Sequence, residues 1–115
     1  MRILHILNHI QEIGNGIVNV AIDLACLQAK ENHEVIVASA GGEYEVLLAR
    51  YDVKHFDLDQ TRKPINLLIA AKRYWSLVKE FQPDIVHVHM MTGIVLASIL
   101  RARTKYVLIS TVHNE

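Results

Sequence analysis

Residues 83–93 read Pro-Asp-Ile-Val-His-Val-His-Met-Met-Thr-Gly, and this stretch decides the fold that we predict. Pro83 ends a preceding helical pattern, because proline lacks the amide hydrogen that a helix interior needs. The β-branched residues that follow favour a short buried strand over residues 85–88. Thr92 is a suitable N-cap for a helix over the next apolar run, residues 92–101. A buried strand that turns directly into a helix is typical of open α/β sheets, where ligands bind beyond the carboxyl ends of the strands.

Strands and helices alternate along the rest of the chain, and several strands are apolar on both faces. This pattern predicts a Rossmann-like parallel sheet of about five strands, because helices must then cover both faces of the sheet. Crossovers are right-handed, which predicts the strand order 3-2-1-4-5, and the more polar third strand should lie near an edge. The predicted strands cover residues 3–7, 35–38, 53–58, 85–88 and 106–112, and the predicted helices cover residues 17–30, 43–51, 65–81 and 92–101.

Composition limits the classes of protein that need to be considered. The 115 residues fit one domain, and a hydrophobic content of 51% is sufficient for a real core. Twelve basic and twelve acidic residues cancel, so net charge gives no case for a nucleic-acid partner. Cys26 is the single cysteine, which excludes an intramolecular disulfide, and its helical context indicates a buried inert thiol. No apolar run approaches the ~20 residues that span a bilayer.

A glycine loop, residues 14–16, lies between the first predicted strand and the first predicted helix. Glycines here let the backbone approach a phosphate at a helix N-terminus, and they equally suit a plain turn that needs positive φ. The dinucleotide motif would need another glycine where this chain has Asn19, and an acidic residue within Ala-Ser-Ala at residues 38–40. We therefore expect no nicotinamide cofactor, while phosphate contact in another pose stays open.

The chain has seven histidines, which is many for its length. His87 and His89 point to the same side of their strand, so they could share a metal ion with a third ligand from His5 or His113. No carboxylate or cysteine is spaced to complete such a site, so we expect no metal. We expect His5 and His87 in the core, with His87 deeper than His89. His89 and His113 fall at strand ends, where ligand contact and a structural role are equally good interpretations.

The predicted strand order brings the ends of the first and fourth strands together at the switch point, and the crevice there would collect residues 8–16, His89 and His113. A different surface carries the basic residues Lys72, Arg73 and Lys79 near Trp75 on the long predicted helix. A membrane-surface helix has this pattern, and so does a solvated face with a half-buried tryptophan, which we favour.

Several short motifs occur in a fixed order along the whole chain. They are Met1-Arg2-Ile3-Leu4-His5-Ile6, the glycine loop, Asp23-Leu24-Ala25, Asn32-His33-Glu34-Val35, Pro83-Asp84-Ile85-Val86-His87-Val88-His89 and Ser110-Thr111-Val112-His113. Together they resemble the N-terminal domain of glycosyltransferase family 4. The resemblance implies the GT-B architecture, in which two Rossmann-like domains face a cleft.

The resemblance implies retaining transfer of a sugar from a nucleotide-sugar donor to an acceptor hydroxyl in glycan, glycolipid or polysaccharide biosynthesis. It implies no metal and no cofactor, since the nucleotide-sugar is a co-substrate. It assigns the donor phosphate to Asn15 and Gly16, the catalytic contact with the transferred sugar to His113, and acceptor binding to His89. The family usually has two adjacent glycines in this loop, so Asn15 departs from the pattern.

The resemblance also implies that residues 1–115 are an incomplete, acceptor-side domain. The missing C-terminal domain would hold the nucleotide through a paired-glutamate motif and basic residues. An apolar sheet edge at residues 106–109 agrees with a fragment. The expected partners are the donor, a glycan or lipid acceptor and that domain, in the cytoplasm or peripherally at the inner face of the membrane. A non-catalytic sugar- or protein-binding module and a small histidine–metal hydrolase stay open as alternatives.

Overall fold

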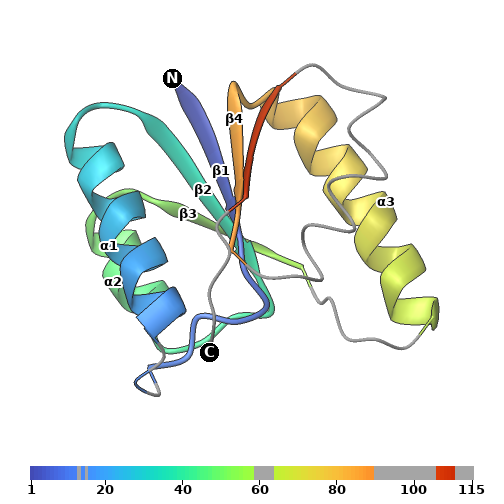
Figure 1. Cartoon of the computed structure of the whole chain (residues 1–115), viewed down its shortest axis with the longest axis horizontal. Helices are drawn as coiled ribbons and strands as arrows, with labels where there is room; N and C mark the ends of the chain where they lie inside the picture. The colour runs from blue at the N-terminus through green and yellow to red at the C-terminus, as the bar shows by residue number, and fades with distance from the viewer. Residues whose placement is uncertain (13, 15, 59–63, 90–105, 111–115) are drawn as a thin grey trace.

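The computed structural model of the chain describes residues 1–12, 14, 16–58, 64–89 and 106–110. The strands are β1 (Arg2–Ile6), β2 (Glu34–Ser39), β3 (Lys54–Asp57), β4 (Ile85–Val88) and β5 (Val107–Ser110), and the helices are α1 (Gly16–Lys30), α2 (Tyr44–Arg50) and α3 (Pro64–Phe81). All neighbouring strands pair in parallel, in the order β3-β2-β1-β4-β5 (Figure 1). This order confirms the predicted Rossmann-like topology, with the switch point between β1 and β4.

The helices are divided between the two faces of the sheet, with α1 and α2 on one face and α3 on the other (Figure 1). The chain steps from β1 through β2 to β3 in one direction and then crosses back to β4. Right-handed crossovers place the helices of opposite steps on opposite faces, which explains the division. The predicted helix over residues 92–101 lies outside the described residues.

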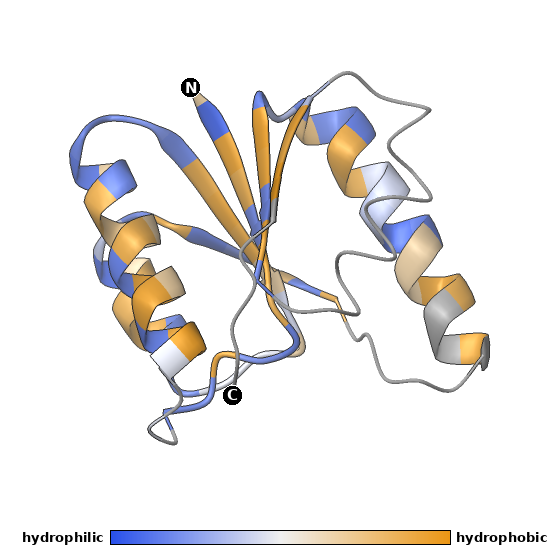
Figure 2. Cartoon of the chain, in the orientation of Figure 1, coloured by the Kyte–Doolittle hydropathy of each residue, from blue (hydrophilic) through white to orange (hydrophobic). Residues whose placement is uncertain are grey.

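Two clusters of buried side chains form the core, one on each face of the sheet. The α3 face buries Leu4, Ile6, Ala38, Leu58, Ala70, Tyr74, Leu77, Val78, Val86 and Val88. The α1 face buries Ile3, Leu7, Ile10, Val18, Ala21, Ile22, Ala25, Cys26, Val35, Val37, Leu48 and Val53. Figure 2 shows β1, β2 and β4 as largely hydrophobic along their length, which follows from burial on both faces, whereas the edge strand β3 is mostly hydrophilic.

Apolar side chains of α1 lie on its exposed side as well as on its buried side. Val20 and Leu27 belong to the apolar pattern of this helix, but they are 57% and 58% exposed. The helix carries apolar residues around much of its circumference, so periodicity alone does not identify the packed face. Cys26 is buried, as predicted, and burial raises the pKa of its thiol.

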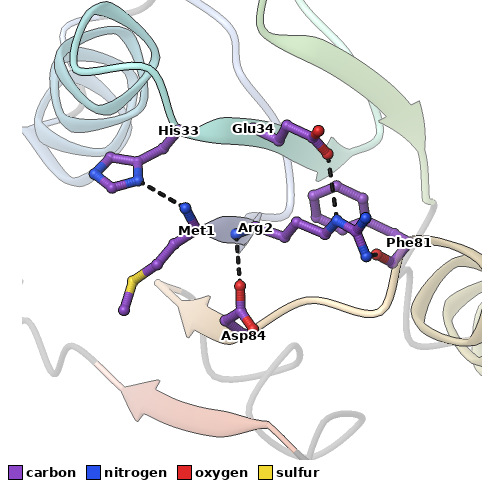
Figure 3. A network of polar contacts seen from close by, with 6 residues as sticks. All are labelled: Met1, Arg2, His33, Glu34, Phe81 and Asp84. Atoms are coloured by element: carbon purple, nitrogen blue, oxygen red, sulfur yellow. Dashed lines mark hydrogen bonds and ion pairs between the residues drawn. The ribbon is translucent and has the colours of Figure 1, made fainter.

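Polar contacts tie together the amino ends of β1, β2 and β4 (Figure 3). The backbone amide of Arg2 donates to Oδ2 of Asp84 at 2.8 Å, and the Arg2 guanidinium lies 3.4 Å from the carboxylate of Glu34. The Met1 amine lies 3.1 Å from Nδ1 of His33. Exposed ion pairs of this kind contribute little stability. Ligand sites of open parallel sheets lie at the opposite edge, beyond the carboxyl ends of the strands.

No described helix is long and apolar enough to cross a membrane. On α3, the Trp75 side chain is 37% exposed and the ammonium of Lys79 lies 5.1 Å from the centre of its ring. This is a cation–π contact on an exposed part of α3, and the choice between a solvated face and a membrane-surface helix stays a prediction.

Candidate functional site

The loop that follows β1 is held firmly against the loop that follows β2. The amide of Ala40 donates to the carbonyl of Asn8 at 2.9 Å, and the amide of Ile10 donates to the carbonyl of Gly41 at 3.1 Å. A Cβ atom at Gly42 would overlap the backbone of Ile10, so only glycine allows this approach. The two loops therefore form one braced surface at the carboxyl edge of the sheet.

The glycine loop leads from this surface into α1. Gly14 has a φ of +75°, and apart from its chain neighbours no heavy atom of the described residues lies within 4 Å of the Cβ that it lacks. The positive φ fits both a plain turn and a close approach by a phosphate, and the open surroundings leave space beside the backbone. Gly16 is the first residue of α1, whose N-terminus carries the positive end of the helix dipole. Asn15 lies outside the described residues, so the phosphate assignment of Asn15 and Gly16 stays a prediction.

Asn8 belongs to the predicted crevice, and the structure makes it a candidate ligand contact, a role that the sequence analysis did not assign to it. Within the described part of the chain, its Oδ1 atom is buried and accepts no hydrogen bond. A buried acceptor without a partner costs about 1–3 kcal/mol, and a ligand or water that donates to it removes this cost. The only signal in the sequence was its position directly after a buried strand, where ligand-binding residues of open sheets lie.

Three histidines meet where β1 and β4 run side by side. His5 of β1 and His87 of β4 are partners in the strand register, and His89 follows the end of β4. Nδ1 of His5 lies 2.9 Å from Nε2 of His89, and the rings of His87 and His89 stack with centroids 3.9 Å apart. One ring nitrogen from each histidine lies within 4.8 Å of the other two.

The hydrogen bond between His5 and α1 fixes the protonation of this cluster. Nε2 of His5 lies 2.6 Å from Oε1 of Gln28, and an amide oxygen only accepts. His5 therefore carries its hydrogen on Nε2, and its Nδ1 lone pair accepts the hydrogen on Nε2 of His89. Burial lowers the pKa of His5 to about 4, against the raising effect of the Gln28 bond and with a further lowering by His87. His5 is thus neutral at pH 7.

The structure confirms one predicted histidine position and corrects two others. His5 is fully buried, as predicted. The predicted order for the other pair is wrong, because His89 is 4% exposed and His87 is only half-buried. The amide of His89 donates to the carbonyl of Ile6, which holds this residue against β1. His87 instead stands beside Ile109 of β5, on a part of the sheet face where Ile109 itself is 40% exposed.

Two of the predicted site residues belong to the described part of the chain. Gly16 and His89 both lie at the carboxyl edge of the sheet, where the predicted crevice requires them. His113 lies outside the described residues, and its role stays a prediction.

Comparison with known proteins gives a family and a fold. The sequence profile of Glycosyltransferase Family 4 matches residues 14–115. No curated protein matches the chain.

Solved glycosyltransferases share the fold of the chain. A glycosyltransferase from Rickettsia africae ESF-5 superposes with a TM-score of 0.79 at 22% identity, covering 99% of this chain and 31% of its own. Anabaena HepE, in complex with UDP-glucose, superposes with a TM-score of 0.74 at 16% identity. The match covers 99% of this chain and 29% of HepE. MurG of Acinetobacter baumannii superposes with a TM-score of 0.66 at 15% identity, and the match covers 95% of this chain and 34% of MurG. The chain therefore spans about a third of the length of these enzymes.

Proposed function

This chain belongs to glycosyltransferase family 4, and from that premise we propose that it is the acceptor-side, N-terminal part of a GT-B glycosyltransferase. The whole protein transfers a sugar from a nucleotide-sugar to a hydroxyl of a glycan or lipid acceptor, with retention of configuration, in the cytoplasm. The observation that carries this proposal is the family match over residues 14–115.

Features at the carboxyl edge of the sheet support binding of the donor phosphates there. In the proposal, the diphosphate lies against Asn15 and Gly16 at the start of α1, where the helix dipole favours negative charge. The positive φ of Gly14 and the open space beside it suit a close approach by a ligand. The unsatisfied Oδ1 of Asn8 can accept a hydrogen bond from a hydroxyl of the sugar. HepE, which shares the fold, is a nucleotide-sugar complex, and this supports the donor class.

In the proposal, His113 and His89 contact the two reacting groups, the transferred sugar and the acceptor. Retaining transfer develops positive charge on the sugar ring and negative charge on the leaving phosphate, so groups fixed beside both centres favour the transition state. We assign the contact with the transferred sugar to His113, beyond β5. We assign the acceptor contact to His89, whose ring must turn away from His5 before a hydroxyl can reach its Nε2 atom.

The test compares the 115-residue chain with the longer protein that joins it to a C-terminal donor domain. Each is incubated with a panel of nucleotide-sugars and with lipid or glycan acceptors, and released nucleotide and glycosylated product are measured. We expect transfer with retained anomeric configuration by the longer protein, and none above a no-protein control by the 115-residue chain. Turnover by the short chain would contradict the assignment of donor binding to the second domain. A folded long protein that transfers no sugar would overturn the proposal itself.

A further inference from the structure

The three clustered histidines form an arrangement that the proposed transfer does not use as a unit. We propose that His5, His87 and His89 bind a divalent transition-metal ion, with Zn²⁺ as the representative ion. Imidazole nitrogen is a preferred ligand of Zn²⁺, and three histidines with one open position are an established zinc ligand set. The required nitrogens already lie within 4.8 Å of one another.

The distance between His5 and His89 fits an ion after a small movement. Two nitrogens at about 2.0–2.1 Å from a tetrahedral zinc ion lie roughly 3.3 Å apart. Nδ1 of His5 and Nε2 of His89 are 2.9 Å apart, so the pair has to open by about 0.4 Å. The ion then takes the place of the hydrogen between the two rings, and His89 carries its hydrogen on Nδ1 instead of Nε2.

Gln28 already supplies the outer contact that a metal-bound histidine needs. Metal-ligating histidines almost always donate their second ring hydrogen to an oxygen acceptor, which fixes the tautomer and the direction of the ring. Oε1 of Gln28 accepts this hydrogen from Nε2 of His5 at 2.6 Å. The bond leaves the Nδ1 lone pair of His5 directed at His89 and, in the proposal, at the ion.

His87 completes the site and gives the ion a route from solvent. Its ring stacks on that of His89 with an angle of 23° between the planes, so it must rotate for the two nitrogens to converge on one ion. His87 is half-buried, whereas His5 and His89 are buried, so the ring that must turn is the most exposed of the three. The fourth coordination position then falls to water, which also helps to solvate the charge of the ion.

The sequence predicted that His87 and His89 lie together, but it did not show whether His5 or His113 would be the third ligand. We expected no metal because no carboxylate or cysteine is suitably spaced near His87 and His89. His5 lies 84 residues before His89 and reaches it only because β1 and β4 pair in parallel. The proposal goes beyond the proposed function and does not depend on it, because its readout is metal binding by the 115-residue chain. An ion on Nε2 of His89 and the acceptor contact proposed for the same atom exclude each other, so the two would compete.

The experiment titrates the untagged, chelator-treated chain with Zn²⁺ and, for spectroscopy, with Co²⁺. We expect one ion per chain by calorimetry and elemental analysis, and visible Co²⁺ absorption typical of a tetrahedral nitrogen site. His87→Asn and His89→Asn should each weaken binding at least about 10- to 100-fold, and Gln28→Ala about 10-fold, as for other outer-shell contacts.

The matched control is His33→Asn, which removes the nitrogen that lies beside the Met1 amine at the opposite edge of the sheet. This variant should bind the metal normally. Absence of binding, or binding that survives His87→Asn and disappears in His33→Asn, would overturn the proposal. If His89→Asn fails to fold by circular dichroism, the half-buried His87 variant decides the outcome.

Discussion

At the scale of single residues, the burial of His5 makes folding stability depend on pH. The pKa of His5 is about 4 in the folded chain, against about 6.5 in an unfolded one. Between these values the unfolded chain binds a proton that the folded chain does not. The contribution of His5 to stability is therefore complete above about pH 6.5 and is lost as the pH falls toward 4. The loss amounts to roughly 3 kcal/mol at most.

Urea denaturation at several values between pH 7 and pH 4 measures this dependence. His5→Gln should flatten the curve in that range, because glutamine does not titrate. His9→Gln, in the loop after β1 and outside the cluster, is the matched variant for the replacement of a histidine by glutamine. His87 and His89 also lie near His5, so the difference between the native and His5→Gln curves is the relevant quantity. Curves that coincide would contradict the prediction.

The assignment of His113 leads to a prediction about turnover in the longer protein. If His113 contacts the transferred sugar, His113→Ala removes a group that favours the transition state and should lower kcat by roughly 10²-fold or more. The variant should fold normally by circular dichroism, since a side chain beyond a strand end contributes little to the core. His33→Ala serves as the control, because His33 lies at the opposite edge of the sheet. Native turnover in a folded His113→Ala protein would assign this histidine a structural role.

The sequence predicted which histidines lie together better than it predicted how deeply each one is buried. Strand alternation correctly placed His87 and His89 together, and the apolar neighbours of His5 correctly indicated burial. Alternation indicates which side of a strand a residue faces, but not how deeply a residue beyond the end of the strand is buried. His87 was therefore predicted to be more buried than His89, and the structure shows the opposite. The unsatisfied oxygen of Asn8 depends on packing between two loops, for which no local pattern exists.

At the scale of elements, the two loops after β1 and β2 depend on a glycine. Gly42→Ala would force the new Cβ against the backbone of Ile10, so the loops must separate. We expect a loss of roughly 3 kcal/mol, the upper range for overpacking. Gly14→Ala is a matched control, because Gly14 has a positive φ but open surroundings, and should cost only about 1–2 kcal/mol. Chemical denaturation measures both, and equal losses would show that the loops adapt.

Strand boundaries were predictable because β-branched runs end at recognisable breaks. The predicted strand at residues 85–88 coincides with β4, which follows Pro83. The helix faces were harder to predict, as the exposed Val20 and Leu27 of α1 show. In a helix with apolar residues on several sides, the packed face is set by the sheet beneath it and not by the helix sequence.

At the scale of the whole molecule, topology followed from a general rule rather than from local signals. Right-handed crossovers leave few arrangements for alternating strands and helices, and the observed order β3-β2-β1-β4-β5 is the one predicted. The same rule sets the edges of the sheet. The polar β3 forms one edge, as expected, and β5 forms the other.

The β5 edge leads to a prediction about association of the 115-residue chain. β5 pairs with β4 on one side, and no described strand pairs with its outer side. Val107 and Ile109 of this strand are 59% and 40% exposed. Unpaired backbone groups beside exposed apolar side chains favour pairing between chains. We therefore expect the apparent mass by light scattering to rise with protein concentration.

Ile109→Lys tests whether that association uses the β5 edge, because a charged side chain on an edge strand opposes pairing between chains. This variant should stay closer to the monomer mass at the same concentration. Val46→Lys is the control, since Val46 on α2 is 64% exposed but belongs to no strand. If both variants reduce association equally, general surface hydrophobicity drives it. A native chain that remains a monodisperse monomer at high concentration would show that the β5 edge is already protected.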